Sequence, residues 1–352
     1  MYLEAEVGQY VLKNVGSLTG LETSLETITD RNGSIVVRAG ERITPEKIEL
    51  LKSNGVNRIW VKVEEVLPPL VDVRKIDEAK EQIQQVFDTV ATKLRIETEQ
   101  VWRVSQTVLN DIVRNYGDKI SLVFLVQQTD EDYTYTHEVH VSMISSLVGL
   151  EMGLKLEELS HLAFSAMIHD VGKALVPKEI LLASRKLTPE EFEIMKKHVA
   201  FGERICRQSG LNDERVISSV RDHHEKLDGS GYLSGLSDRQ ISLFARIVSV
   251  VDIYDALVSN RSYKPSWTPY KAMTEIIRLA SLNKLDAKVV KSMVSLLGLY
   301  PIGTTVVLNE GTKAIVVGVN RRNPLRPIVQ IENGETIDLT EEKNLRVVSV
   351  LE

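Results

Sequence analysis

Acidic and histidine side chains stand beside long apolar runs in the middle of this chain. One run leads into His169 and Asp170, and another leads into Asp252. Burying an unpartnered carboxylate costs several kcal/mol, roughly, so such groups are paired or metal-bound when they occur in a core. Any fold of this chain must therefore bring these acids to counterions or metals. The candidate set contains five of the chain's seven histidines and two aspartates: His137, His169, Asp170, His198, His223, His224 and Asp252.

The chemistry of this set favours a metal-dependent hydrolase. Imidazoles and carboxylates without a thiolate suit iron, manganese, zinc or nickel. The two oxygens of Asp170 could bridge two ions about 3.5–4 Å apart, an arrangement that clamps a phosphoryl group during in-line attack. Lys173 could then neutralise charge on a phosphate oxygen. His169 and Asp170 can share one centre only if their helix ends there, and Gly172 is consistent with such an end.

Each of these residues also has a simpler explanation. A single histidine near an apolar helix is more often an ordinary core residue than a ligand. Aspartates inside apolar helices are rarer, and two of them with five spaced histidines make coincidence a poor explanation. We expect His140 and His161 not to be ligands. Asp255, one helical turn after Asp252, is expected to lie behind the metal ligands and to contact them. Glu203 is expected on a solvated face.

Composition sets further bounds. A length of 352 residues allows two or three domains, and 43% hydrophobic with 26% charged residues is ordinary for a globular protein. The lone Cys206 excludes an intramolecular disulfide and fits a cytoplasmic location. No run approaches the ~18 apolar residues of a membrane span, and no secretory signal pattern is present. A net charge of -6 without a basic face argues against polymeric nucleic acid as a partner.

The first part of the chain, residues 1–66, predicts a small α+β module. Two β-type runs flank the Asn32-Gly33 turn signal. A short helix follows, with Thr44 as its cap, Pro45 in its first position and Gly55 at its end. The run from Val56 to Val63 reads as a strand. We expect this module to be regulatory or sensory.

Residues 67–128 predict a linker followed by helices. Leu67-Pro68-Pro69-Leu70 cannot continue a helix. Apolar residues then recur at three- and four-residue spacing. Two interpretations are equally good: a helical hairpin that packs onto the next domain, or a signalling helix that forms a homodimer. The recurring positions are Ile83, Val86, Phe87 and Val90, then Val101, Val104, Val108 and Ile112.

Residues 129–299 predict an α-helical bundle that carries the candidate ligands. Residues 300–352 predict a small β-rich domain, with runs at 306–307, 314–317, 328–331 and 345–348 and a turn at Asn333-Gly334. The fold class expected is a multidomain protein with an all-α core. The expected bundle helices are Leu156–Ile168, Pro189–Ser209, Asp213–Glu225, Ser242–Ser259 and Pro269–Leu282.

The segment from His223 to Tyr232 is the sharpest local signal. Its Asp228-Gly229-Ser230-Gly231 stretch predicts a loop whose backbone can approach a ligand closely. Tyr232 offers an aromatic face for stacking a base, worth about 1–3 kcal/mol in single-strand nucleic-acid systems. Arg261 and Lys264, nine and twelve residues after Asp252, suit the phosphates of an anionic ligand, although such a pair alone is more often surface charge.

Together these motifs resemble the HD-GYP domain of the HD superfamily of metal-dependent phosphohydrolases. The resemblance covers residues 129–300 and rests on His169-Asp170 with Gly172-Lys173, on His198, and on His223-His224-Glu225 with the loop to Tyr232. The lead-in to His137 and the stretch from Asp252 to Tyr263 match as well. It implies a bacterial phosphodiesterase that opens cyclic di-GMP to pGpG and often on to GMP, with two or three ions, commonly iron or manganese.

Carried over to this chain, the resemblance assigns roles to residues. One ion is expected on His137, His169, Asp170 and Asp252, and the other on Asp170, His198, His223 and His224. Asp170 and Lys173 are expected to act at the scissile phosphate, with a metal-bridging hydroxide as nucleophile. Substrate contacts are expected from Gly231, Tyr232, Arg261 and Lys264.

Two departures from the family pattern matter. The family's Gly-Tyr-Pro reads Gly231-Tyr232-Leu233 here, so the stiffening proline is missing. The glutamate that supports a third ion is replaced by Tyr133, which favours two ions unless Glu131 or Asp132 substitutes. The alternatives to a cyclic di-GMP phosphodiesterase are a cyclic di-GMP sensor with little turnover and an HD-type phosphohydrolase of other nucleotides.

Overall fold

The computed structural model describes ten stretches of the chain, and they fall into two compact units, residues 1–68 and 69–352. The described stretches are 10–18, 22–24, 27–30, 33–38, 41–56, 58–62, 70–116, 133–259, 266–331 and 335–351.

The first unit combines short strands with one helix. A three-stranded antiparallel sheet has the order β1-β5-β2, built from Tyr10–Asn14, Arg58–Lys62 and Thr23–Ser24. A 3-10 turn, η1, covers Val15–Ser17. Strands β3 (Ile28–Thr29) and β4 (Ile35–Val37) pair on either side of the expected turn, whose Arg31 and Asn32 lie outside the described residues.

Helix α1 of this unit spans Pro45–Ser53 and begins where the sequence predicts. Thr44 holds the N-cap position, but its side chain makes no capping hydrogen bond. Gly55 has a φ of 73°, a conformation that glycine adopts without steric cost. The helix buries Leu51 against Ile59 and Val61 of β5, which forms a small separate core.

The second unit begins with a helical hairpin. Helices α2 (Val73–Lys93) and α3 (Thr98–Asn115) carry the predicted apolar spacing, while residues 117–132 lie outside the described part. Ile83 and Val90 of α2 and Val104 and Ile112 of α3 are buried in the same core as the helices that follow. This favours the hairpin that packs onto the next domain, because the apolar face on which a dimer would rest is covered by the chain itself.

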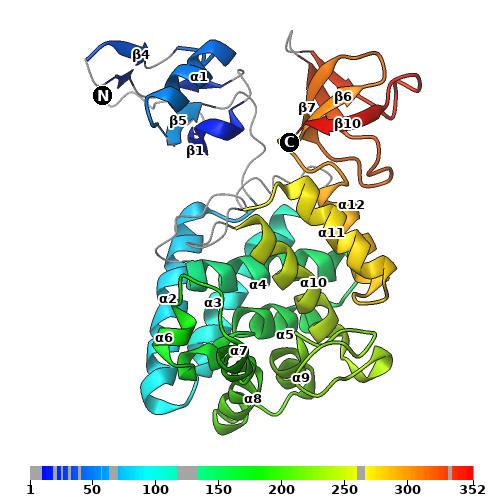
Figure 1. Cartoon of the computed structure of the whole chain (residues 1–352). Coiled ribbons are helices and arrows are strands. Elements are labelled where there is room, and N and C mark those ends of the chain that lie inside the picture. The colour runs from blue at the N-terminus through cyan, green and yellow to red at the C-terminus, as the bar shows by residue number, and fades with distance from the viewer. Residues whose placement is uncertain are drawn as a thin grey trace, which may run out of the picture. The chain divides into compact units, whose positions relative to one another are not determined.

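A helical bundle follows, with α4, α5 and α10 at the centre of the helical part (Figure 1). Its apolar helices pack their faces into one core that runs through the unit. The elements in chain order are α4 (Tyr133–Glu151), α5 (Leu156–Met167), η4 (Val171–Leu175), α6 (Lys178–Leu181), α7 (Pro189–Lys196), α8 (His198–Gln208), α9 (Glu214–Asp222), η5 (Asp238–Gln240), α10 (Leu243–Val258), α11 (Pro269–Ser281) and α12 (Ala287–Leu297).

The sequence prediction was wrong at one helix of the bundle. It expected a single helix over Pro189–Ser209, whereas the structure has α7 and α8 with a break at Lys197. Pattern alone could not find this break, because the apolar spacing continues across it. Helices α4 and α12 were not among those expected.

The last part of the unit is a five-stranded antiparallel sheet in the order β10-β6-β7-β8-β9. Alternating residues such as Val306, Leu308, Val316 and Val329 fill its core. The four predicted runs correspond to β6, β7, β8 and β10, whereas β9 was not expected. The strands are Thr305–Leu308, Lys313–Gly318, Ile328–Ile331, Thr336–Asp338 and Val347–Leu351.

A polar cluster joins this sheet to the bundle. Glu151 at the end of α4 accepts hydrogen bonds from Tyr116 (2.6 Å) and Ser295 (2.7 Å). The guanidinium of Arg321 lies 4.6 Å from the centre of the Tyr116 ring. Among the described residues, no helix is long and apolar enough to cross a membrane.

Candidate metal centre

His169 and Asp170 lie between a helix and a 3-10 turn, so helical spacing does not force their side chains to point in different directions. Helix α5 ends at Met167, and the 3-10 turn η4 begins at Val171. Gly172 permits η4 to approach α8 very closely, since a Cβ placed there would come within 1.9 Å of the carbonyl oxygen of His198. The glycine after the pair therefore brings Asp170 to His198, a role that the sequence did not reveal.

The break at Lys197 positions the next histidine. His198 is the first residue of α8, and its Nδ1 donates to the carbonyl oxygen of Met195 at 2.7 Å. Its Nε2 lies 3.1 Å from Oδ1 of Asp170. The break lets α8 begin at His198, with its imidazole beside Asp170.

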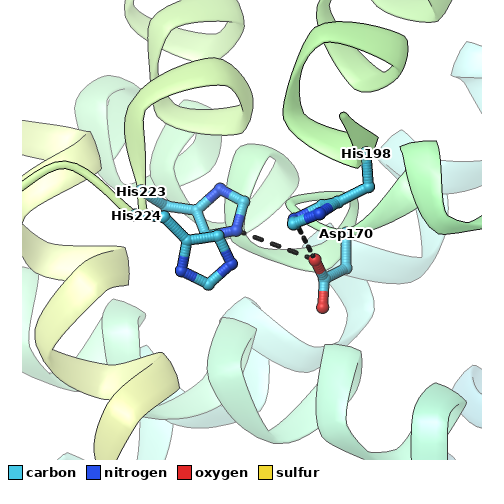
Figure 2. A group of neighbouring side chains, drawn as sticks. All are labelled: Asp170, His198, His223 and His224. Atoms are coloured by element: carbon cyan, nitrogen blue, oxygen red, sulfur yellow. Dashed lines mark ion pairs between the residues drawn. The ribbon is translucent and has the colours of Figure 1, made fainter. Parts of the chain in front are cut away.

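The structure gathers the candidate residues into two groups of possible metal ligands, and Asp170 belongs to both. In one group, His198, His223 and His224 face Asp170 from α8 and from the end of α9 (Figure 2). In the other, Asp170 is joined by His137 and His169.

Asp252 of α10 lies beside the second group and reaches the first. Its Oδ1 is 3.2 Å from Nε2 of His137 and 3.9 Å from Nε2 of His169. Its Oδ2 is 3.8 Å from Nδ1 of His224. A carboxylate at this place can complete the ligands of an ion on either side.

The donor atoms fit divalent ions. In the part of the chain that the structure describes, Nε2 of His169, His198 and His223 and Oδ1 of Asp170 are buried without a hydrogen-bond partner. Unpartnered polar atoms are rare in protein cores and call for an explanation. Four of them directed at one small region are explained by ions that take nitrogen and oxygen ligands.

The proton positions of the histidines support the same conclusion. A carbonyl oxygen can only accept, so each Nδ1 that faces one must carry the proton, which leaves Nε2 for a metal. Nδ1 of His223 donates to Val220 (3.0 Å), and Nδ1 of His169 to Ala166 (2.9 Å). His198 uses Met195 in the same way.

Two buried carboxylates stand behind the His137 and His169 group. Oδ2 of Asp255 lies 2.6 Å from Nδ1 of His137, and Oε2 of Glu138 lies 3.0 Å from Nδ1 of His169. Asp255 was expected to stand behind the ligands, whereas the sequence analysis did not single out Glu138. The sequence shows only an acid directly after His137, and its complete burial is a finding of the structure.

The pKa values of the histidines at the centre shift in opposite directions. Burial lowers the pKa of His169, but Glu138 and Asp170 outweigh it and raise that pKa to about 10. Burial lowers the pKa of His223 to about 4, despite its contact with Asp170. Burial opposes the ionisation of Asp170, but the charges of Lys173 and His169 keep its pKa well below the usual value. His223 and Asp170 are therefore already in the states that bind metals, a neutral imidazole and an ionised carboxylate, whereas His169 must first release a proton.

Lys173 forms an ion pair with Oδ2 of Asp170, and its side chain remains partly exposed. It is thus a cation at the edge of the centre. His140 and His161 were expected not to be ligands. His140 Nδ1 lies 3.5 Å from Oδ1 of Asp255, and His161 contacts Glu157 and Asp213 instead.

The loop after His224 is held by Glu225, a residue to which sequence reasoning gave no role. Its carboxylate accepts hydrogen bonds from the backbone N–H groups of Ser234 (2.7 Å), Gly235 (3.1 Å) and Leu236 (3.1 Å). Gly231 packs onto this residue so closely that a Cβ would come within 2.4 Å of the Glu225 Cα. A buried acid therefore anchors the segment that follows Tyr232, where this chain lacks the proline of the family motif.

A pocket of about 660 Å³ opens beside the centre. The candidate ligands His224 and Asp252 line it together with Gly231 and Tyr232. Lys226 also lines it, and its Nζ donates to Oγ of Ser249 at 3.0 Å. Burial lowers the pKa of Lys226 to about 8, so a cation still faces the pocket at neutral pH.

Several predicted residues cannot be placed. Arg261 and Lys264 lie outside the described residues, as do Glu131 and Asp132. Tyr133 begins α4, but its side chain also lies outside the described part.

The part of the chain that forms this centre matches a known protein family. Residues 121–289 match the HD domain family. The match extends over slightly less than half of the 352 residues. The HD domain thus covers α4 to the start of α12, the part of the chain that supplies all seven candidate ligands.

Curated relatives match between 42% and 72% of the chain. The cyclic di-GMP phosphodiesterase PA4108 of Pseudomonas aeruginosa is 33% identical over 258 residues, which is 72% of this chain and 60% of that protein. A cyclic di-GMP phosphodiesterase of Thermotoga maritima is 40% identical over 148 residues, or 42% of this chain and 40% of the relative. A 3'3'-cGAMP-specific phosphodiesterase of Vibrio cholerae is 30% identical over 164 residues, or 47% of this chain and 38% of the relative. The chain therefore spans less than two thirds of the length of each of these three relatives.

A solved structure agrees with the fold. Bd1817 of Bdellovibrio bacteriovorus, described as an HDG"Y"P protein, superimposes with a TM-score of 0.51 at 16% identity, covering 82% of this chain and 99% of that one. At this identity the likeness concerns the fold alone.

Proposed function

We propose that this protein is a metal-dependent phosphodiesterase that hydrolyses cyclic di-GMP to linear pGpG, with GMP as the product of a second cleavage. One observation carries the proposal. Buried Nε2 and carboxylate atoms without hydrogen-bond partners converge from two groups that share Asp170, beside a pocket large enough for a nucleotide. The relatives named as cyclic di-GMP phosphodiesterases support the choice of substrate.

The ion assignment follows from the two groups. His137, His169, Asp170 and Asp252 would hold one divalent ion, and Asp170, His198, His223 and His224 the other. Iron or manganese suits these nitrogen and oxygen donors, and two ions match the two groups. Bound there, the ions would acidify a water molecule and stabilise the charge of the phosphoryl group during in-line displacement.

The chain's own residues would position the substrate around the ions. Lys173 would turn from Asp170 to a phosphate oxygen, and Lys226 offers a second cation in the pocket. Gly231 lets the loop backbone lie close to the substrate, and Tyr232 contributes an aromatic ring at the pocket wall. Arg261 and Lys264 would meet phosphates from the segment after α10.

Two other functions are less well supported by the structure. A cyclic di-GMP sensor with little turnover would not need two complete ligand groups. A phosphohydrolase of mononucleotides is disfavoured by the loop with Gly231 and Tyr232 at the pocket wall and by the Arg261 and Lys264 pair. The cGAMP-specific relative makes a second cyclic dinucleotide a reasonable competitor for the same site.

The decisive experiment combines metal analysis with a turnover assay. Protein purified without oxygen should contain about two iron or manganese ions per chain and convert cyclic di-GMP to pGpG, as followed by chromatography. 3'3'-cGAMP and cyclic di-AMP should be assayed in parallel, with a chelator-treated sample and Asp170→Asn as controls. Binding without turnover by the metal-loaded protein would establish the sensor instead, and faster cleavage of cGAMP would reassign the substrate.

A further inference from the structure

The aromatic ring of Phe192 on α7 faces the same pocket as the candidate ligands but has no role in the centre itself. It is 46% exposed, although a phenylalanine of this size is normally buried. The centres of the Phe192 and Tyr232 rings lie 6.2 Å apart, with the rings nearly perpendicular at 78°. The pocket therefore has an aromatic corner made by two elements that are distant in sequence.

Tyr232 is less available for stacking than the sequence suggested. Its ring stacks on the imidazole of His224, with centres 4.7 Å apart and 29° between the planes. One face of Tyr232 is thus taken by a candidate metal ligand, and burial raises the pKa of the phenol. The exposed ring at this corner is Phe192.

A cation and a capped helix start lie near Phe192 on α7. Lys196, one turn further along α7, places its Nζ 5.4 Å from the Phe192 ring centre and 5.8 Å from that of Tyr232. The helix start is fixed by Thr188 and Glu191, whose side chains cap each other's backbone N–H groups. A ring on so well anchored a helix loses little freedom when a ligand stacks on it.

Building on the proposed function, we propose that the exposed ring of Phe192 is a stacking surface for one purine base of the cyclic dinucleotide, with Tyr232 as the neighbouring wall of this subsite. A planar base gains from apolar contact and from stacking on an aromatic face, whereas its phosphates go to the cations and ions at the other lining residues. Because every base has such a face, the subsite binds guanine and adenine equally well. It therefore supplies affinity, and the choice between bases must come from contacts to their edges.

The test compares Phe192→Ala with Phe192→Trp in the metal-loaded protein. Equilibrium binding is measured with a phosphorothioate analogue of cyclic di-GMP that resists hydrolysis, and KM and kcat are measured with cyclic di-GMP itself. Phe192→Ala should weaken affinity about tenfold and raise KM to match, with kcat and metal content nearly unchanged. Phe192→Trp should retain affinity, and its added indole fluorescence should be quenched when the analogue binds.

Leu182→Ala is the matched control, because Leu182 is an exposed apolar residue (73%) that does not line the pocket. It should leave affinity unchanged. Unaltered affinity in Phe192→Ala, while wild-type protein cleaves cyclic di-GMP, would overturn the subsite and leave the proposed function standing. Wild-type protein that neither binds nor cleaves cyclic di-GMP would overturn both.

Discussion

The two sides of the candidate metal centre are equally buried but differ in what stands behind their histidines. The carboxylates of Asp255 and Glu138 lie beside Nδ1 of His137 and His169, and we call these two histidines the carboxylate-backed side. Nδ1 of His169 also donates to the carbonyl oxygen of Ala166, so its difference from the other side is the added negative charge of Glu138. His198 and His223 donate to backbone carbonyl groups, and we call them the carbonyl-backed side.

The pKa values follow this difference. The pKa of His169 is raised to about 10 by the carboxylates, whereas burial lowers the pKa of His223 to about 4. Burial alone thus does not decide the charge of a buried imidazole; the groups that face it do. The comparison implies that the carboxylate-backed side attracts a cation more strongly but must first release a proton.

The largest effect is expected from removing the residue that both sides share. Asp170→Ala should reduce the metal content from about two ions per chain to nearly none, since each ion loses a ligand and the negative charge between them. Elemental analysis of the purified variant measures this, with circular dichroism as a control for folding. Retention of one ion at full occupancy would show that Asp170 serves one side only.

A smaller loss is expected from Glu138→Ala. Partners behind metal-bound histidines typically contribute 10–100-fold to metal affinity, so the carboxylate-backed side should release its ion first when a chelator is titrated. Glu138→Gln keeps an oxygen beside His169 but removes the negative charge, and it should recover part of the loss. Equal release of both ions by Glu138→Ala would remove the distinction between the two sides.

Substrate affinity should be separable from metal binding on either side of the centre. Charge-assisted hydrogen bonds to phosphate are worth about 1.5–3 kcal/mol, so Arg261→Ala should weaken cyclic di-GMP affinity about tenfold to a hundredfold without loss of metal. Lys264→Ala should act in the same direction but less, because an ammonium lacks the planar fork of arginine. Calorimetric titration with the hydrolysis-resistant analogue, and metal analysis of the same samples, check this.

The smallest expected effect is that of one pH unit, which should change metal affinity about tenfold. In metal-free protein His169 stays protonated below about pH 10, so an incoming ion must displace that proton and its affinity should rise with pH. His223 is already neutral above about pH 4 and adds no such dependence. Isothermal titration in buffers of different ionisation enthalpy counts the released protons. Glu138→Gln should release fewer, and an unchanged count would contradict the assignment.

Much of the architecture could be predicted from periodicity and turn residues. The bundle helices that begin near Leu156, Ser242 and Pro269 start and end close to the expected residues. The strands of the C-terminal sheet other than β9 also lie where apolar runs predict them. The break at Lys197 could not be predicted, since the apolar spacing continues across it.

The sequence by itself determined which side chains had to meet, because histidines and aspartates within apolar helices have few other stable arrangements. It also determined the helical core between short-stranded flanking parts. Only the tertiary structure decided what stands behind each histidine, that Glu225 holds the loop, and that Phe192 faces the pocket. These are contacts between residues far apart in the chain, and local periodicity carries no information about which distant group will fill the space beside a side chain.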